Sequence, residues 1–191
     1  MDFGLSDEQR LIVDTVRRFV RTELAPLEDE VEATGRLAPE AARAVHQKSR
    51  ELGLYAMNVP AELGGGGLSA VDTMLVEEQF GHTTDILIRR AFGNVYEALF
   101  ACRGEQVERW LTPTVQGQRV CSIAITEPAA GSDAAGISTR ATPTARGGWH
   151  LSGNKHFISD GEVSDFFSFS ALTSAPDAAK KEISLFLVDK G

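Results

Sequence analysis

The sequence predicts an α+β fold in which an all-helical N-terminal domain precedes an incomplete antiparallel β-barrel domain. Apolar residues recur at helical spacing in the segment before Pro113. After Gln118 the pattern changes to short β-branched or aromatic runs of alternating polarity. Because helices come first and strands afterwards, we expect a helical domain over residues 1–116 and a middle β-barrel domain, itself truncated, over residues 117–191.

Capping residues and helix breakers bound the expected helices. Ser6 with Gln9 forms a capping box that opens the first helix, and Pro26 ends or kinks it. Pro39 suits the first turn of a second helix that stops near Gly53. Further helices are expected over residues 69–81, 84–102 and 105–111, with Ser69 and Asp72 opening the first of these and Pro113 closing the last.

Short apolar runs in the second half predict strands. They cover residues 120–125, 139–142, 149–151, 155–158, 166–171 and 183–188. Gly147-Gly148 and Gly153-Asn154 lie between neighbouring runs and predict hairpin turns, and residues 174–181 predict an exposed hairpin tip. The run 184–188 is too apolar for an open edge, so the β domain is expected to continue beyond it.

Composition argues against several classes of function. The formal charge of −8 does not suit nucleic acid, and no apolar run reaches the roughly 18 residues of a membrane-spanning helix. The four histidines lack ligand spacing, so no metal site is expected. Residues 1–8 resemble no secretory signal, and Cys102 and Cys121 are expected to be reduced, buried thiols of a cytoplasmic protein.

Gly64 to Ala70 has the GxGxxA spacing of a dinucleotide-binding loop. No convincing strand precedes it, and Arg89 and Arg90 stand where an acidic residue is needed. A flexible interhelical loop explains the same glycines without a ligand.

The segment from Ala124 to Gly136 is the first candidate site. It leaves a strand and enters a polar turn, which places the Thr126 hydroxyl and the backbone of Gly131-Ser132 at the end of a rigid element. A hydroxyl suits the pyrimidine edge of a flavin, and a concave cluster of N–H groups suits its pyrophosphate.

Lys155 to Ser159 is the second candidate segment, expected as a strand. The Ser159 hydroxyl suits the flavin edge near N5, and Phe157, two positions earlier on the same strand face, suits the ring. Each residue also has an ordinary explanation, since Thr126-Glu127-Pro128 suits a turn, Asp133 suits a cap and Phe157 suits a core.

These segments carry a family resemblance. The run Ala-Ile-Thr-Glu-Pro-Ala-Ala-Gly-Ser-Asp-Ala-Ala-Gly (124–136) resembles the signature of the acyl-CoA dehydrogenase family. Leu151 to Ser159 is similar to that family's second flavin motif, and Leu5 to Arg10 and Val59 to Gly65 look like its N-terminal domain. The resemblance spans the whole chain but covers only part of a typical member.

The resemblance implies FAD as cofactor and α,β-dehydrogenation of an acyl-CoA, with electrons passed to an electron-transfer flavoprotein. It also implies that the full-length protein is a homodimer or homotetramer. It implies a flavin lined by Ile123, Ile125, Thr126, Gly131, Ser132, Phe157, Ile158 and Ser159. Ser132 would lie between the flavin pyrophosphate and the acyl-CoA. The family most often has Trp and Thr where this chain has Phe157 and Ser159; Phe keeps a stacking surface without the indole N–H, and Ser keeps the hydroxyl.

No catalytic residue is expected in this chain. The family's glutamate base belongs to a C-terminal four-helix bundle, and none of Glu77, Glu78, Glu97 or Glu127 matches its place. The 191-residue chain is therefore expected to be inactive alone, with Glu127 structural. Two alternatives remain open: a flavin oxidase or monooxygenase of the same fold, and a non-catalytic partner subunit that completes a shared site.

Overall fold

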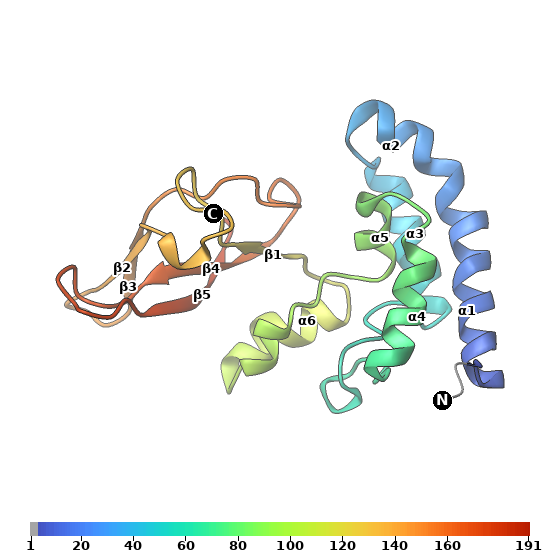
Figure 1. The fold of residues 1–191 in the computed structure, drawn as a ribbon, viewed down its shortest axis with the longest axis horizontal. Coiled ribbons are helices and arrows are strands. Elements are labelled where there is room, and N and C mark those ends of the chain that lie inside the picture. Colours follow the sequence, from blue (N-terminus) through green and yellow to red (C-terminus); the bar gives the residue numbers. More distant parts are fainter. Residues whose placement is uncertain (1–3) are drawn as a thin grey trace. The chain divides into compact units, whose positions relative to one another are not determined.

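A computed structural model describes residues 4–191 and divides them into two compact units (Figure 1). The first contains the residues up to Val95 together with Val115–Gly117, and the second contains Tyr96–Thr114 together with Gln118–Gly191. The expectation that residues 1–8 form no secretory signal includes residues 1–3, which lie outside the described residues. The expected domain boundary between residues 116 and 117 stays a prediction.

The first unit is helical, as expected. Its elements are α1 (Asp7–Phe19), a π-helical turn (Val20–Leu24), a 3-10 turn (Ala25–Leu27), α2 (Glu28–Thr34), α3 (Pro39–Glu51), a 3-10 turn (Ala61–Leu63), α4 (Ala70–Phe80) and α5 (Asp85–Ala91). The capping box at the start of α1 is confirmed, because Ser6 Oγ accepts the Gln9 N–H at 3.1 Å and Gln9 Oε1 accepts the Ser6 N–H at 3.0 Å. Pro26 kinks the chain without stopping it, since α2 follows the 3-10 turn at once.

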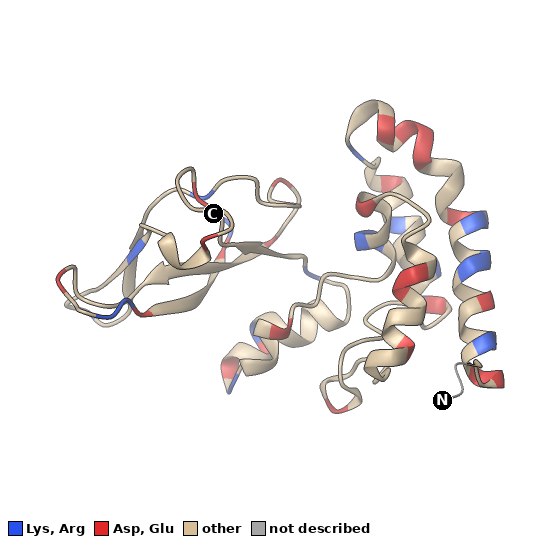
Figure 2. Ribbon diagram, viewed as in Figure 1, with Lys and Arg blue, Asp and Glu red and all other residues tan. Residues whose placement is uncertain are grey.

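Apolar faces of these helices form one core. The Phe80 ring on α4 contacts Phe19 of α1 at a centroid distance of 6.4 Å and Phe92 after α5 at 5.5 Å. The core comprises Val16, Phe19, Val20, Leu24, Val31, Val45, Leu54, Met57, Val76, Phe80, Leu87, Ala91 and Phe92. Charge lies outside it: α1 carries both signs, whereas the charged residues of α2 are all acidic (Figure 2).

The fourth helix is shorter than predicted, because α5 ends at Ala91 and only a 3-10 turn (Glu97–Ala101) follows. Gly93 has φ +91°, a conformation that residues with a side chain rarely adopt. A Cβ at this position would lie 2.7 Å from the Tyr55 ring. The chain therefore turns here because of a close packing contact that the local sequence does not reveal.

Pro113 does not close the fifth helix as predicted. A π-helical turn (Val107–Leu111) runs directly into α6 (Thr112–Val115), so Pro113 lies inside a helical stretch. The Thr114 hydroxyl donates to the Trp110 carbonyl oxygen at 2.6 Å. Side-chain donors thus satisfy backbone carbonyls around the proline.

The glycine-rich loop is an interhelical loop. The N–H groups of Gly65 and Gly66 donate to the carbonyl oxygens of Pro60 and Ala56 at 3.2 and 3.0 Å. A Cβ on Gly65 would lie 2.3 Å from the Val59 carbonyl oxygen. The glycines allow the backbone to fold tightly on itself, and these two donors are already used within the protein.

The second unit contains a mixed sheet. Its strands are β1 (Cys121–Ala124), β2 (Arg140–Pro143), β3 (Trp149–Ser152), β4 (Phe166–Leu172) and β5 (Ile183–Asp189), with a 3-10 turn (Ala134–Gly136) between β1 and β2. The β2–β3 hairpin turns at Gly147-Gly148, as predicted, with both glycines at positive φ. Residues 174–181 lie in the connection of the β4–β5 hairpin.

Strand β4 is the centre of this sheet. It pairs in parallel with β1 (Cys121↔Phe166) and with β2 (Arg140↔Leu172), and antiparallel with β5. The sheet is thus mixed where a wholly antiparallel one was expected, because the long connection between β1 and β4 returns the chain to the same end. The α+β class, with N-terminal helices and an incomplete barrel, is confirmed.

The strand predicted over residues 155–158 is absent. Phe157 has φ +55° and Asp160 has φ +59°, which interrupts an extended backbone. Gly153-Asn154 accordingly leads into a loop and not into the second strand of a hairpin. No helix within residues 4–191 is both long enough and apolar enough to cross a bilayer.

Candidate functional site

The first candidate segment begins at the end of strand β1. Its Ser122 and Ala124 side chains are buried, whereas Ile123, Ile125 and Thr126 are half-buried. Pairing with β4 holds β1 rigidly up to Ala124, so the residues that follow leave a fixed point of the sheet.

The loop Lys155–Ser159 lies alongside β1 although it is not a strand. The His156 N–H donates to the Thr126 carbonyl oxygen at 2.8 Å, and Ser122 Oγ donates to the Ser159 carbonyl oxygen at 2.7 Å. The two contacts run in opposite directions along the chain, so loop and strand are antiparallel neighbours. The structure therefore brings the two candidate segments together by isolated hydrogen bonds and not by a strand ladder.

A tight turn follows Thr126. The N–H and carbonyl groups of Glu127 and Ala130 pair with one another at 2.9 and 3.1 Å. Gly131 and Ser132 come next and are exposed. No atom of the described chain lies within 4 Å of a Cβ built on Gly131, so the backbone there is open to a ligand.

A buried ion pair lies between the two segments. Lys155 Nζ lies 2.9 Å from Glu127 Oε1, and the two side chains are only 4% and 3% exposed. Sequence reasoning did not identify this pair. A signal was present, since a charged residue next to a strand-like apolar run needs a charged partner when it is buried.

The Glu127 carboxylate is held ionised. Burial on its own raises the pKa of Glu127, but hydrogen bonds from Thr139, from Ser138 and from Lys155 outweigh it and hold the pKa well below its usual range. The Thr139 and Ser138 N–H groups donate at 3.0 and 2.7 Å, and Ser138 Oγ donates at 2.7 Å. Every strong donor around this carboxylate therefore favours its charged form.

Lys155 also contacts groups other than Glu127. Its Nζ donates to the Ile125 carbonyl oxygen at 2.9 Å and to Ser170 Oγ of β4 at 3.0 Å. It lies 5.3 Å from the Phe169 ring centroid. One ammonium group thus joins the end of β1, the central strand and the second candidate segment.

The second segment presents an aromatic face. Phe157 is 83% exposed and stacks on His156 with ring centroids 3.8 Å apart and planes 16° apart. Ile158 is half-buried and Ser159 is exposed. A planar aromatic surface, hydroxyl groups and an exposed glycine-serine backbone are the groups that a flavin nucleotide needs.

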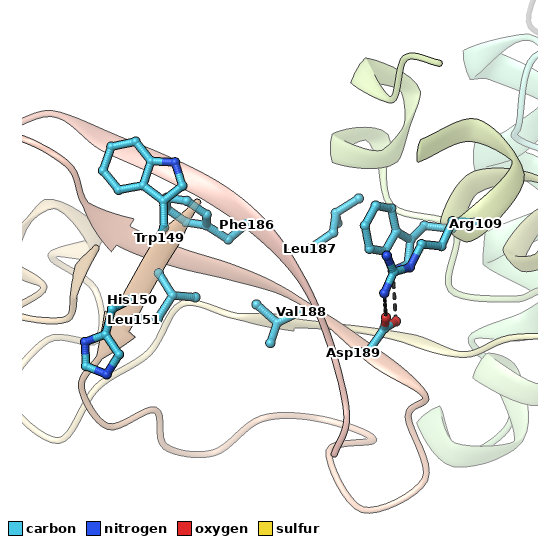
Figure 3. Close-up of a pocket in the computed structure, with 9 residues that line it drawn as sticks. Arg109, Trp149, His150, Leu151, Phe186, Leu187, Val188 and Asp189 are labelled. Atoms are coloured by element: carbon cyan, nitrogen blue, oxygen red, sulfur yellow. Dashed lines mark hydrogen bonds and ion pairs between the residues drawn. The ribbon is translucent and has the colours of Figure 1, made fainter. Parts of the chain in front are cut away.

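A separate pocket lies elsewhere in the same unit. Its volume is about 540 Å³. Aromatic and aliphatic side chains of β3 and β5 line it, together with Arg109 and Trp110 of the π-helical turn Val107–Leu111 (Figure 3). At one end Asp189 accepts hydrogen bonds from Arg109, from Arg119 at 2.7 Å and from Trp110 Nε1 at 3.0 Å. None of the candidate flavin residues lines this pocket.

Within residues 4–191 no group of three or more His, Cys, Asp or Glu side chains is arranged to hold a metal ion. Cys102 and Cys121 are free and buried. Burial raises the pKa of the Cys121 thiol to about 12, so it is protonated at neutral pH.

Comparison with known proteins gives consistent matches. Residues 6–118 match the family model of the acyl-CoA dehydrogenase N-terminal domain, and residues 122–191 match that of the acyl-CoA dehydrogenase middle domain. Benzylmalonyl-CoA dehydrogenase of Aromatoleum aromaticum is 34% identical over 195 residues, covering 100% of this chain and 49% of its own length. The chain thus spans about half the length of the curated relatives it matches.

Solved structures of similar fold agree with these sequence matches. An acyl-CoA dehydrogenase from Bacillus anthracis complexed with FAD matches with a TM-score of 0.79 and 28% identity, covering 97% of this chain and 31% of that one. A structure of the electron transferring flavoprotein of Acidaminococcus fermentans matches with a TM-score of 0.82 and 27% identity, covering 100% of this chain and 50% of that one.

Proposed function

This chain belongs to the acyl-CoA dehydrogenase family, and from that premise we propose that it forms the N-terminal part of a flavin-dependent enzyme that introduces an α,β double bond into an acyl-CoA. The proposed cofactor is FAD, which when bound would supply the acceptor for the β-hydrogen that leaves the substrate as hydride. Electrons then pass to an electron-transfer flavoprotein.

One observation carries this proposal. The two segments that resemble flavin motifs lie about 30 residues apart in the chain, yet the His156 N–H and the Thr126 carbonyl oxygen are 2.8 Å apart. A hydroxyl-bearing strand end and an exposed aromatic loop therefore lie next to each other in the second unit. The relative from Bacillus anthracis, which has the same fold in these parts, binds FAD.

Each residue has a proposed role at this site. Thr126 donates to the pyrimidine edge, and Ile123 and Ile125 supply apolar contact beside it. Gly131 and Ser132 offer backbone N–H groups to the pyrophosphate, and Ser132 also faces the acyl-CoA. On the other side of the ring lie Phe157, Ile158 and Ser159.

Glu127 is not the base that removes the substrate α-proton. Its carboxylate already accepts hydrogen bonds from Ser138, Thr139 and Lys155, and it is buried beneath them. Its lowered pKa makes it a poor proton acceptor. Glu77, Glu78 and Glu97 are exposed on helices of the chain. We propose that the base is supplied from outside these 191 residues.

Fluorescence titration of the purified chain with FAD tests the cofactor site. We expect saturable binding that Thr126→Val weakens about two- to tenfold, because one hydrogen bond to an uncharged group contributes about 0.5–1.5 kcal/mol. Thr142→Val is the matched control, since Thr142 is exposed on β2. Equal weakening by both variants, or no binding by the wild type, would contradict the proposed site.

Activity tests the rest of the proposal. The purified chain is expected not to turn over any acyl-CoA with an electron-accepting dye, because the proposed base is supplied from outside these 191 residues. Turnover by this chain alone would refute that. Consumption of oxygen by the active assembly, in place of reduction of a flavoprotein, would favour the oxidase alternative. A cytoplasmic location and assembly into dimers or tetramers stay predictions of the sequence.

A further inference from the structure

We infer that Lys155 is a positioning residue, which sets the geometry of Thr126 and of the Gly131-Ser132 loop together through the Ile125 carbonyl and the Glu127 carboxylate. This inference rests on the proposed FAD site and names the residue that organises it. Lys155 itself is not placed in contact with the flavin.

Lys155 and its neighbour hold the peptide groups around Thr126. Lys155 Nζ donates to the Ile125 carbonyl oxygen at 2.9 Å, and the next residue, His156, donates its N–H to the Thr126 carbonyl oxygen at 2.8 Å. With two successive carbonyls held, the peptide planes on both sides of Thr126 are fixed. The direction of the Thr126 side chain then depends on the ammonium group of Lys155.

Through Glu127 the same ammonium group acts on the loop that carries Gly131 and Ser132. Glu127 begins this loop, and its carboxylate accepts the N–H groups of Ser138 and Thr139, which end it. The carboxylate therefore joins the two ends of the loop, while residues 131–135 between them stay exposed. Without Lys155, Glu127 would be a buried carboxylate without its cationic partner and would have to move or take up a proton.

A contribution to folding stability does not by itself explain why Lys155 and Glu127 are paired in the interior. A buried ion pair loses much hydration, and replacing it by uncharged groups of similar size is often neutral for stability. A single ammonium that joins β1, β4, the Glu127 loop and the second segment instead determines one arrangement of all four. Since the proposed pyrimidine and pyrophosphate contacts come from different parts of this arrangement, the pair couples them.

The test compares three variants of the full chain: Lys155→Met, the uncharged double variant Lys155→Met/Glu127→Gln, and the control Lys181→Met in the exposed β4–β5 connection. We expect Lys155→Met to raise the Kd for FAD by about tenfold to a hundredfold, by analogy with metal sites, where loss of a residue that orients a metal ligand has an effect of this size. The double variant is expected to recover thermal stability without recovering FAD affinity, because Ile125 still lacks its donor. Lys181→Met should bind as the wild type does.

Two readouts separate positioning from general destabilisation. The reduction potential of FAD bound at saturation is expected to become more negative in both Lys155 variants, because a misplaced Thr126 stabilises the reduced ring less. In the FAD-free chain, the Ser138, Thr139 and His156 amides are expected to exchange faster, while amides of α1 are unchanged. A purely structural role would lower the folded fraction and leave the potential of bound FAD as it was.

The outcomes are distinguishable. If the wild type binds FAD and the Lys155 variants bind equally well with the same potential, the inference is wrong and the proposed function stands. If the wild-type chain takes up no FAD, the proposed site and the inference both fail. If even the double variant does not fold, the pair is a folding element and the positioning role is excluded.

Discussion

Arg119 donates a hydrogen bond from Nη1 to the carbonyl oxygen of Arg109 over 2.9 Å. Pro113 lies four residues after Arg109 and has no N–H, so it cannot make the usual helical bond to this carbonyl. The same guanidinium donates to Asp189 at the end of β5 at 2.7 Å. Arg119 thus supplies the donor that Pro113 lacks and joins this helical stretch to the sheet.

Arg119→Met is expected to lower the free energy of unfolding of the second unit by about 1–3 kcal/mol, because it removes donors from a carbonyl and a carboxylate. Urea denaturation, followed by the fluorescence of Trp110 and Trp149, measures this. Arg146→Met, at an exposed position in the β2–β3 turn, should change the midpoint little. A similar midpoint for both variants would mean that water replaces Arg119 at no cost.

Asp189 predicts a particular pH dependence. Hydrogen bonds from Arg119, and then from Arg109 and Trp110, outweigh the effect of burial and lower the pKa of Asp189 to about 2. Because the folded pKa is below the unfolded one, the stabilisation is complete above about pH 4 and disappears as the pH falls toward 2. The wild type is expected to be more stable than Asp189→Asn at pH 6, with a difference that shrinks over this window. A constant difference from pH 6 to pH 2 would contradict the assignment.

Two glycines of the candidate site should respond oppositely to alanine. A Cβ on Gly153 would lie 2.2 Å from Thr139 Oγ1 and 2.7 Å from Thr139 Cα, so Gly153→Ala must displace buried backbone. We expect it to cost about 1–3 kcal/mol of stability. Gly131→Ala meets no atom within 4 Å and is expected to be neutral or to gain up to about 1 kcal/mol. Thermal unfolding of both variants, without FAD, decides the matter; a stable Gly153→Ala chain would show that the approach to Thr139 is loose.

Phe157 combines an exposed ring with a backbone of positive φ. Such a conformation costs a residue with a side chain about 1–3 kcal/mol, whereas glycine adopts it freely. Phe157→Gly is therefore expected to be more stable than Phe157→Ala by about 1 kcal/mol, since both lose the ring and only glycine relieves the strain. Both should bind FAD more weakly than the wild type. Equal urea midpoints for the two variants would argue against strain at this position.

Features of the chain that depend on near neighbours in sequence could be predicted. Ser6 caps a helix through Gln9, and Ser69 accepts the N–H of Asp72 three residues later, so these helix starts follow from local hydrogen bonds. The Gly147-Gly148 turn is equally local. The two candidate segments were also visible in the sequence, because hydroxyl, glycine and aromatic residues occur there in a recognisable order.

Features that depend on contacts with residues distant in the sequence could not be predicted. Gly93 turns the chain because Tyr55 lies over it, and Pro113 stays inside a helix because Arg119 supplies a donor. Residues 155–158 have strand-like composition, yet Phe157 is held at positive φ beside β1. In each case the deciding contact involves a residue that no periodicity or spacing identifies.

The amino-acid sequence by itself determined the order of helices and strands, the helix starts and the family of this protein, because these depend on residue types at short, regular separations. Only the tertiary structure decided that Lys155 and Glu127 meet in the interior, 28 positions apart in the chain. Burial makes that meeting obligatory, since neither charge is stable away from water without the other.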